Sequence, residues 1–320
     1  MESMTPPPKK IALLFPGQGS QSVGMGKELY DAFSSVREIF EMADDITHLH
    51  ITRMCFDGPI ETLTETVHLQ PALTAVNLAC LDILHQHGIT AHVSAGHSLG
   101  EYSALTSAGV LSASDCMRLV YRRGGFMHRE ATKNRGAMHA IVGLSITEVQ
   151  GMVDSVRQQG GIVSVANHNT ELQIVITGSP DAVTAVSSLA AQSGARAVPL
   201  KVSGAWHSEL IKDAEPDFAE VLQETVFSDP RHDIVLNVTG DFGKTASHIQ
   251  SVMIRQLCSP VRWFPSMKQL IDDRVYAFVE VGPGRVLAGL LKQILPKDYS
   301  GQVYNANSLK RLEQIGNELA

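Results

Sequence analysis

The chain has 320 residues, of which 44% are hydrophobic and 18% charged, a composition typical of a soluble globular protein with one large domain and a smaller one. The formal net charge is −7 and the sequence has no basic stripe, so we expect no nucleic-acid partner. The four cysteines form no C-x-x-C pair and the first apolar stretch, Ile11–Phe15, is too short for a signal peptide or a membrane span, so we expect a cytoplasmic protein that contacts no membrane.

The N-terminal part of the chain alternates strands and helices. Residues 1–9 are polar and proline-rich, and we expect them to form a disordered lead. Ile11–Phe15 is a continuous apolar run, which predicts a strand buried on both faces of a parallel sheet. Helices are predicted over residues 25–45, 71–87, 101–110 and 113–131, with a short strand before residue 97. This alternation predicts an α/β fold with a largely parallel sheet.

The middle of the chain has a different pattern. Strands are predicted over residues 137–142, 162–167, 172–177 and 195–202, and helices over residues 145–159 and 181–193. The order β-α-β-β-α-β is that of a ferredoxin-like unit. We expect this small domain at residues 132–203, inserted into a large domain formed by residues 10–131 and 204–320. The rest of the large domain is predicted to contain a helix at 208–226, a strand at 234–238, helices at 246–257 and 262–272, a strand at 275–281 and a closing helix.

The most informative motif is GHSLG at residues 96–100, between a predicted strand and a predicted helix. A serine in Gly-x-Ser-x-Gly lies on a sharp turn that only small flanking residues tolerate, and the turn exposes its hydroxyl. The helix that follows points its N-terminal N–H groups toward whatever the serine attacks. The motif in this context predicts Ser98 as the nucleophile of an acyl-transfer reaction.

A serine nucleophile needs a general base, and the chain has 13 histidines. His207 follows a predicted strand at the point where the chain leaves the small domain, and sites in α/β sheets form at the carboxyl ends of strands. Spacing alone ranks it equal with His97, His168 and His232. The base is therefore left open among these four residues.

Two arginines lie in the helix after the serine motif, Arg122 and Arg123. A guanidinium can hold a carboxylate by two hydrogen bonds, so one of them would suit an acyl group that ends in a carboxylate; two solvated arginines are the alternative. Motifs for other chemistry fail. The loop after the first strand lacks the third glycine of a dinucleotide fingerprint, and no histidine pair has zinc-ligand neighbours, so we expect no metal.

Six sequence blocks occur in a characteristic order: FPGQGSQ at 15–21, QPAL at 70–73, GHSLGEY at 96–102, RGGFM at 123–127, WHS at 206–208 and EVGPG at 280–284. With these blocks the chain resembles the malonyl-CoA:acyl-carrier-protein transacylases of fatty-acid synthesis and the related acyltransferase domains of polyketide synthases, from about residue 10 to 310. The resemblance implies a hydrolase-like parallel-sheet large domain with an inserted ferredoxin-like small domain. It also implies ping-pong transfer of a malonyl group from malonyl-CoA to the phosphopantetheine thiol of holo acyl carrier protein. No cofactor would be permanently bound, because the coenzyme A thioester is the substrate.

The resemblance implies roles for residues of the reaction centre. Ser98 would be the acylated nucleophile and His207 its general base. A backbone carbonyl at Gln256 would orient the histidine. The backbone N–H groups of Gln18 and Leu99 would form the oxyanion hole.

The resemblance also implies a substrate-binding set. Arg123 would bind the malonyl carboxylate, with Met127, His97 and Gln70 around the acyl group. Trp206 stands where the family usually has serine or phenylalanine. Its bulk is expected to crowd an α-methyl branch, which favours malonyl over methylmalonyl groups.

Other functions share parts of this pattern of serine, histidine and arginine. The same chemistry could serve a polyketide pathway or a malonate decarboxylase. A serine esterase or thioesterase would need an acidic residue between serine and histidine in the chain, and Asp154 and Asp181 lie in that window. A docking module without catalysis is disfavoured because Ser98 and His207 are both present. A basic patch for the carrier protein is expected among Lys133, Arg135, Arg196 and Lys201.

Overall fold

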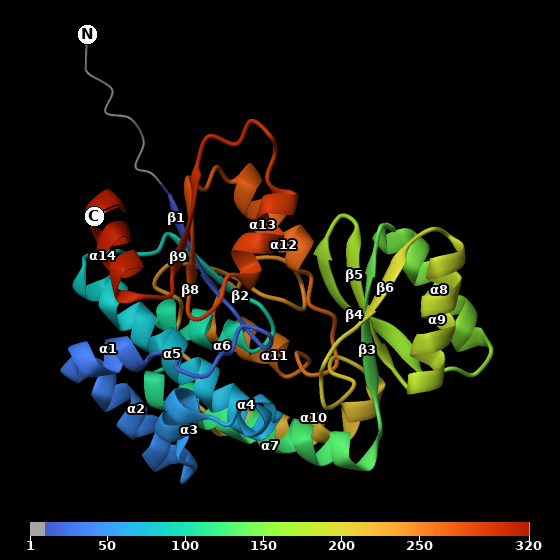
Figure 1. The fold of residues 1–320 in the computed structure, drawn as a ribbon, viewed down its shortest axis with the longest axis horizontal. Coiled ribbons are helices and arrows are strands. Elements are labelled where there is room, and N and C mark those ends of the chain that lie inside the picture. The colour runs from blue at the N-terminus through green and yellow to red at the C-terminus, as the bar shows by residue number, and fades with distance from the viewer. Residues whose placement is uncertain (1–9, 320) are drawn as a thin grey trace.

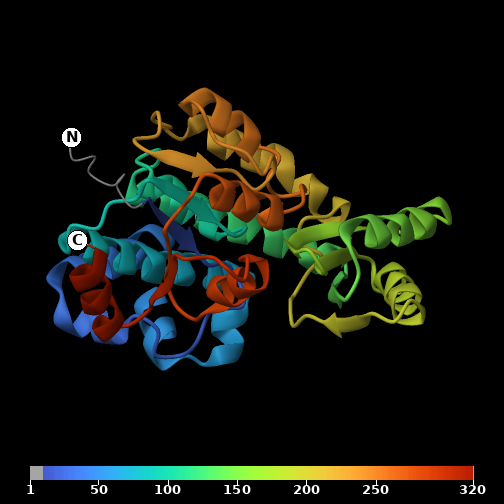
Figure 2. The same ribbon diagram turned by 90° about the horizontal axis from the view of Figure 1, so that it is seen from above.

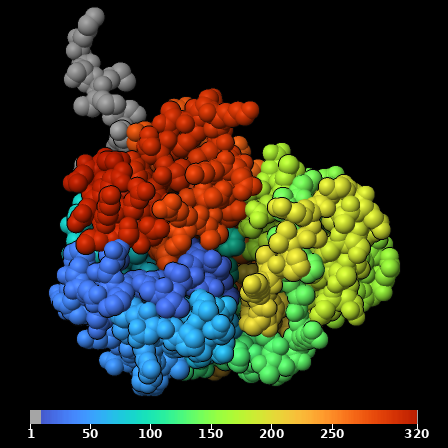
Figure 3. All heavy atoms as spheres, viewed as in Figure 1, coloured from blue at the N-terminus to red at the C-terminus, as the bar shows by residue number. Residues whose placement is uncertain are grey.

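The computed structural model describes residues 10–319, and the predicted lead at residues 1–9 lies outside this range. Within it the chain forms two β-sheets, one built from the N-terminal and C-terminal parts of the chain and one from the middle, coloured green to yellow in Figure 1. The two bodies lie side by side, as the view from above and the space-filling view also show (Figures 2 and 3). This architecture confirms the predicted α/β fold with a smaller antiparallel unit.

The larger sheet has five parallel strands in the order β7-β2-β1-β8-β9. Their bounds are Ile11–Phe15 (β1), Val93–Gly96 (β2), Asp233–Val235 (β7), Ala277–Val281 (β8) and Gln302–Ala306 (β9). The central strand β1 is buried throughout, as its continuous apolar run predicts. Its side chains alternate between two cores, with Leu13 in one and Leu14 in the other. Because the strands are parallel, the loops after β1, β2 and β8 share one edge of the sheet, and the site forms there.

Helices cover both faces of this sheet (Figure 1). Their bounds are Lys27–Ala32 (α1), Ser34–Thr47 (α2), Ile51–Asp57 (α3), Ile60–Thr64 (α4), Thr66–Gln86 (α5), Gly100–Ser107 (α6), Ala113–Lys133 (α7), Glu209–Ala214 (the 3₁₀ helix η1), Glu215–Glu224 (α10), Ala246–Met253 (α11), Trp263–Asp272 (α12), Val286–Ile294 (α13) and Leu309–Leu319 (α14). Helices α5, α6 and α7 pack into the core that contains Leu13. Helices α12 and α13 pack into the core that contains Leu14.

Helix α5 begins earlier than predicted. The predicted helix spans residues 71–87, but the helix begins at Thr66 and Pro71 lies inside it. That prediction was wrong because burial of nearly every side chain from Leu69 to Leu84 stabilises the helix across the missing N–H bond. Of the helices in residues 10–319, α5 alone is long and apolar enough to cross a membrane, and 83% of its most apolar window is buried inside the protein.

The smaller sheet has four antiparallel strands in the order β4-β5-β3-β6. The bounds are Ala137–Val142 (β3), Val163–Thr170 (β4), Gln173–Gly178 (β5) and Arg196–Pro199 (β6), with helices Ile146–Gln158 (α8) and Pro180–Gln192 (α9). The first strand lies between the third and the fourth, which is the ferredoxin-like arrangement. This sheet has its own hydrophobic core with α8 and α9. It meets the large body through β4, where His168 N–H donates to the Val261 carbonyl at 2.9 Å.

Several elements differ from the prediction. Helices α3 and α4, strand β9 and helix α14 were not predicted, and β6 is shorter than the predicted 195–202. The predicted helix at 208–226 is divided into η1 and α10. Strand β9 has a mixed sequence, QVYNA, that becomes a strand because it pairs with the buried strand β8 along its whole length. Such pairing is a tertiary effect that local periodicity does not contain.

Candidate active site

Ser98 lies at the turn between β2 and α6, in left-handed backbone with φ of 51°. This region is unfavourable for a residue with a side chain, so the surrounding structure must hold the turn in this conformation. The flanking glycines allow close approach. A Cβ on Gly96 would overlap the backbone of Gly100, and one on Gly100 would overlap the Phe15 carbonyl of β1. The Gly-x-Ser-x-Gly pattern is therefore needed where β1, β2 and α6 converge.

His207 lies against this serine. Its Nε2 is 2.8 Å from Ser98 Oγ, although 109 residues separate the two in the chain. Its Nδ1 is 2.9 Å from the Ser259 carbonyl and 3.2 Å from the Gln256 carbonyl. A carbonyl only accepts, so Nδ1 carries the proton and Nε2 is free to accept the serine proton. Of the four candidate histidines, His207 is the one whose ring contacts Ser98 Oγ.

The electrostatics of His207 favour the neutral ring. Burial, followed by the charges of Arg123 and His97, lowers its pKa to about 3. The ring is therefore neutral at physiological pH and available as a base. Ser259 was not singled out by the sequence, because a backbone carbonyl can come from any residue type.

Arg123 is 1% exposed, and its Nη2 lies 3.3 Å from Ser98 Oγ. Its Nη1 donates to Gln70 Oε1 at 2.8 Å and its Nε to Gln256 Oε1 at 3.2 Å. Among residues 10–319 it forms no ion pair. The exposed Arg122 instead covers the ring of Phe126 at 5.2 Å. A buried guanidinium with neutral partners leaves a place for an anion beside the serine.

Two residues of the predicted substrate set support Arg123. Gln70 and Met127 are buried, and Gln70 Nε2 lies 3.2 Å from the Met127 sulfur. Gln70 comes from α5 and Met127 from α7, the helix that also carries Arg123. Together they form the wall behind the guanidinium.

His97 and Trp206 have other surroundings. His97 Nε2 lies 2.9 Å from Asn169 Oδ1 of β4. The His97 and Trp263 rings pack edge to face, with 5.5 Å between their centroids. Burial lowers its pKa. Trp206 is 4% exposed, and a Cβ on Gly204 would touch its six-membered ring. Its indole N–H has no acceptor within residues 10–319.

The two predicted oxyanion donors lie in adjacent loops. A Cβ on Gly17 would come 2.5 Å from the His97 carbonyl and 3.6 Å from the Leu99 nitrogen, so the loop after β1 lies against the serine turn. In the described part of the chain, the backbone N–H groups of Gln18 and Leu99 have no protein acceptor. Free N–H groups beside an activated serine can stabilise a developing oxyanion.

No carboxylate accepts from His207 in the described chain, since both Nδ1 partners are carbonyls. The Asp154 carboxylate accepts a hydrogen bond from the Gln150 side chain on α8, and Asp181 lies exposed at the start of α9. Within residues 10–319, His207 therefore lacks the acidic partner that an esterase triad requires. In the same range, no group of three or more His, Cys, Asp or Glu residues could hold a metal.

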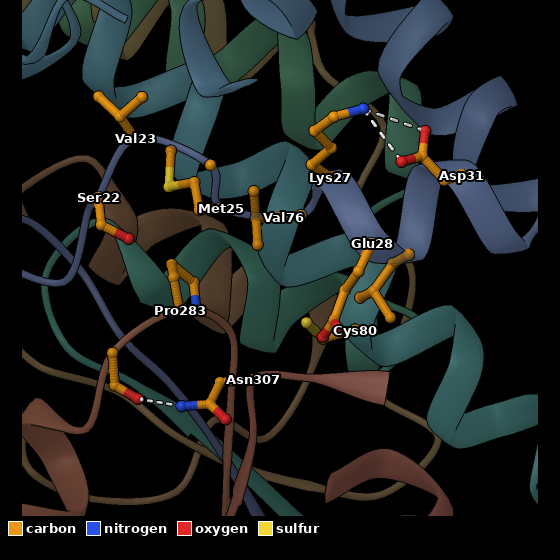
Figure 4. Close-up of a pocket in the computed structure, with 14 residues that line it drawn as sticks. Ser22, Val23, Met25, Lys27, Glu28, Asp31, Val76, Cys80, Pro283 and Asn307 are labelled. Carbon is orange, nitrogen blue, oxygen red and sulfur yellow. Dashed lines mark hydrogen bonds and ion pairs between the residues drawn. The ribbon is translucent and has the colours of Figure 1, made fainter. Parts of the chain in front are cut away.

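A cavity of about 580 Å³ lies elsewhere, between the β1–α1 loop, α5 and the turn after β8 (Figure 4). Its rim carries the Lys27–Asp31 ion pair at 3.0 Å, and Asn307 donates to the Gly284 carbonyl across its floor. None of the residues that line it contacts Ser98 Oγ. This cavity is therefore separate from the cluster of side chains around Ser98.

Comparison with known proteins agrees with this geometry. The sequence model described as "Acyl transferase domain" matches residues 12–314, so the chain belongs to the class of acyl transferase domains. The malonyl CoA-acyl carrier protein transacylase of Bacillus subtilis is 43% identical over 286 residues, which is 89% of this chain and 90% of that protein. The crystal structure of FabD from Acinetobacter baumannii has a TM-score of 0.92 at 36% identity and covers 98% of both chains. The chain belongs to the malonyl-CoA:acyl-carrier-protein transacylase family.

A further solved structure, a type II polyketide acyl-carrier protein in complex with its malonyl-transacylase, has a TM-score of 0.91 at 36% identity. It covers 96% of this chain and 99% of that one. That pair shows a transacylase of this fold bound to its carrier protein.

Proposed function

We propose that this chain transfers a malonyl group from malonyl-CoA to the thiol of holo acyl carrier protein through a malonyl ester on Ser98. The observation that carries the proposal is a serine oxygen in contact with both a neutral imidazole, His207 Nε2 at 2.8 Å, and a buried guanidinium, Arg123 Nη2 at 3.3 Å. The imidazole supplies a base, and the guanidinium supplies selectivity for an acyl group with a carboxylate.

In the first half-reaction, Ser98 Oγ attacks the thioester carbonyl carbon while His207 Nε2 takes the hydroxyl proton. The oxyanion that forms is stabilised by the N–H groups of Gln18 and Leu99, at about 3–4 kcal/mol for each donor. The C–S bond then breaks, and His207 returns the proton to the departing thiolate of coenzyme A. The carbonyls of Gln256 and Ser259 stabilise the imidazolium in the interval.

The second half-reaction runs in reverse with a different thiol. His207 takes the proton of the phosphopantetheine thiol, and the sulfur attacks the malonyl ester. The C–O bond breaks, and Ser98 recovers its proton from the imidazolium. No cofactor takes part, because the substrate thioesters carry the activated acyl group.

We infer that Arg123 holds the malonyl carboxylate. A guanidinium has five N–H donors. Three are used by Gln70, Gln256 and Ser98, so two remain for a carboxylate. The bound carboxylate also offsets the charge that lowers the pKa of His207, so the substrate itself strengthens the base.

We assign the other substrate contacts by position. Gln70 accepts a hydrogen bond from Arg123, and the Met127 sulfur contacts the amide nitrogen of the same Gln70 side chain. His97 lies next to the nucleophile and is tied to β4 of the small body by Asn169, which supports a role in the wall of the thioester site. Trp206 precedes the base and is the residue that excludes an α-methyl branch.

We divide the chain into a large domain at residues 10–131 and 204–320 and a small domain at 132–203. The separate core of the small sheet supports this division. Docking of the carrier protein at Arg135, Arg196 and Lys201, which are exposed, is consistent with a basic patch; Lys133 is engaged by the Glu130 carboxylate at 3.0 Å. The described cysteines are free thiols, which supports a cytoplasmic location.

Fatty-acid synthesis is the context that the family supports best. Supply of a polyketide carrier protein is the second candidate, because the polyketide pair matches this fold at 36% identity. The test is intact-mass measurement after mixing with malonyl-CoA. The wild type gains a malonyl adduct and Ser98→Ala does not; an adduct on the variant would remove Ser98 from its role.

A further inference from the structure

Three buried polar side chains lie behind the serine turn. Glu101 is the second residue of α6, Asn237 follows β7, and Gln256 follows α11. Their exposed fractions are 0%, 3% and 1%. Glu101 directly follows the Ser98 turn, whereas Asn237 and Gln256 lie more than 130 residues further along the chain. The Gln256 side chain also accepts from Arg123 Nε.

Asn237 and Gln256 hold the two peptide groups on either side of the Ser98 Cα. Asn237 Oδ1 accepts the Ser98 N–H at 2.7 Å, and its Nδ2 donates to the Gly96 carbonyl at 2.6 Å. Gln256 Nε2 donates to the Ser98 carbonyl at 2.8 Å. Because these two peptide groups set φ and ψ of Ser98, the contacts fix its unfavourable left-handed conformation.

Glu101 connects Asn237 to Gln256, through the backbone of the first and the side chain of the second. Its Oε1 accepts the backbone N–H of Asn237 at 2.8 Å, and its Oε2 accepts from Gln256 Nε2 at 2.9 Å. Both carboxylate oxygens thus face N–H donors, which suits the ionised form. Burial raises the pKa of Glu101 to about 7, and these two contacts and the charge of Arg123 act against that rise.

Gln256 extends the connection to the base and the guanidinium. Its backbone carbonyl lies 3.2 Å from His207 Nδ1, and its side-chain Oε1 accepts from Arg123 Nε. A shift of Gln256 would therefore move the nucleophile, the base and the carboxylate site together.

We propose that Glu101 is a positioning residue for acylation, which locks Asn237 and Gln256 against the Ser98 turn so that Ser98 Oγ stays aligned with His207. The inference rests on the proposed function, since it requires Ser98 to be the nucleophile. Glu101 acts through its two partners and does not touch the substrate. Its contribution therefore falls on the chemical step and not on binding of malonyl-CoA.

A second buried carboxylate offers a matched control. Glu280 on β8 is 1% exposed and accepts the N–H groups of Leu287 and Ala288 and the Nδ2 of Asn305, each at 2.8–2.9 Å. It has the same burial and the same type of donors as Glu101. It contacts neither Ser98 nor the two amide side chains.

The experiment compares Glu101→Gln with Glu280→Gln by rapid-quench intact-mass measurement of Ser98 acylation across a range of malonyl-CoA concentrations, alongside urea unfolding of both variants. We expect Glu101→Gln to slow acylation at saturation by about 10- to 100-fold, because a small misalignment at a reaction centre has effects of that size. The half-saturating malonyl-CoA concentration stays within about threefold, and Glu280→Gln keeps the wild-type acylation rate.

Acylation of Glu101→Gln at the wild-type rate would overturn the proposal, as would loss of acylation in both variants in proportion to their loss of stability. If Glu101→Gln does not fold, Asn237→Ser removes the acceptor of the Ser98 N–H and leaves the carboxylate in place. The proposal then requires a similar loss at saturation, and a wild-type rate overturns it. Failure of the wild type to form any malonyl adduct would instead contradict the proposed function.

Discussion

Replacement of Arg123 by alanine tests the selectivity of the site. The guanidinium has two N–H donors left for a malonyl carboxylate after its contacts with Gln70, Gln256 and Ser98. A hydrogen bond to a charged group contributes about 1.5–3 kcal/mol, so two contribute about 3–6 kcal/mol. At about 1.4 kcal/mol for each tenfold change in rate, Arg123→Ala should slow malonyl transfer by about 10²- to 10⁴-fold.

Acetyl-CoA has no carboxylate, so this change removes no contact with its acyl group. Removal of the Arg123 charge also relieves one cause of the low pKa of His207, so the imidazole becomes a stronger base. We therefore expect acylation by acetyl-CoA to stay constant or rise. The ratio of the malonyl rate to the acetyl rate should fall by at least about 100-fold.

The assay is intact-mass measurement of acyl-Ser98 at timed intervals with each thioester, and Arg122→Ala is the matched control because that arginine is exposed. Arg123→Ala leaves Gln70 Oε1 without its donor, at a cost of about 1–3 kcal/mol, and leaves Gln256 Oε1 with only the Tyr102 hydroxyl at 3.5 Å. Both rates are therefore measured on protein shown by circular dichroism to be folded. Equal loss of malonyl and acetyl transfer would refute the carboxylate role of Arg123.

The remaining predictions concern pH and the acyl pocket. With the pKa of His207 lowered to about 3, the base is neutral above that value. Because the Glu101 carboxyl has a pKa of about 7 and would add its own inflection, the profile is measured on Glu101→Gln, in which acylation by acetyl-CoA should stay flat from about pH 5 to 8 and decline only in more acidic solution. A stopped-flow pH profile with an inflection near 6.5 would contradict this. Trp206→Ser should admit methylmalonyl groups, which a competition between malonyl-CoA and methylmalonyl-CoA followed by mass measurement would reveal. Unchanged discrimination would mean that the indole does not face the acyl group.

Much of the fold could be predicted from the sequence because it depends on local pattern. The apolar run of β1 indicates a strand buried on both faces, and the order of strands and helices in the middle of the chain predicts the ferredoxin-like sheet. Ser145 and Glu148 form a capping box at the start of α8, with the serine side chain and the glutamate side chain each bonded to the other's backbone N–H. Elements that depend on pairing with a distant strand, such as β9, were missed.

The candidate site divides in the same way. The sequence by itself determined that Ser98 lies on a sharp strand-to-helix turn, because the glycines around it are local and their spacing is specific. Only the tertiary structure decided which of four histidines reaches that serine and which of two adjacent arginines turns inward, because burial and contact depend on how distant segments pack. The contact of Asn237 with the Ser98 N–H and that of the Ser259 carbonyl with His207 were likewise decided by the tertiary structure. A period of two or 3.6 residues describes the face of an element, whereas a meeting of residues more than 100 positions apart is set by the packing of the whole chain.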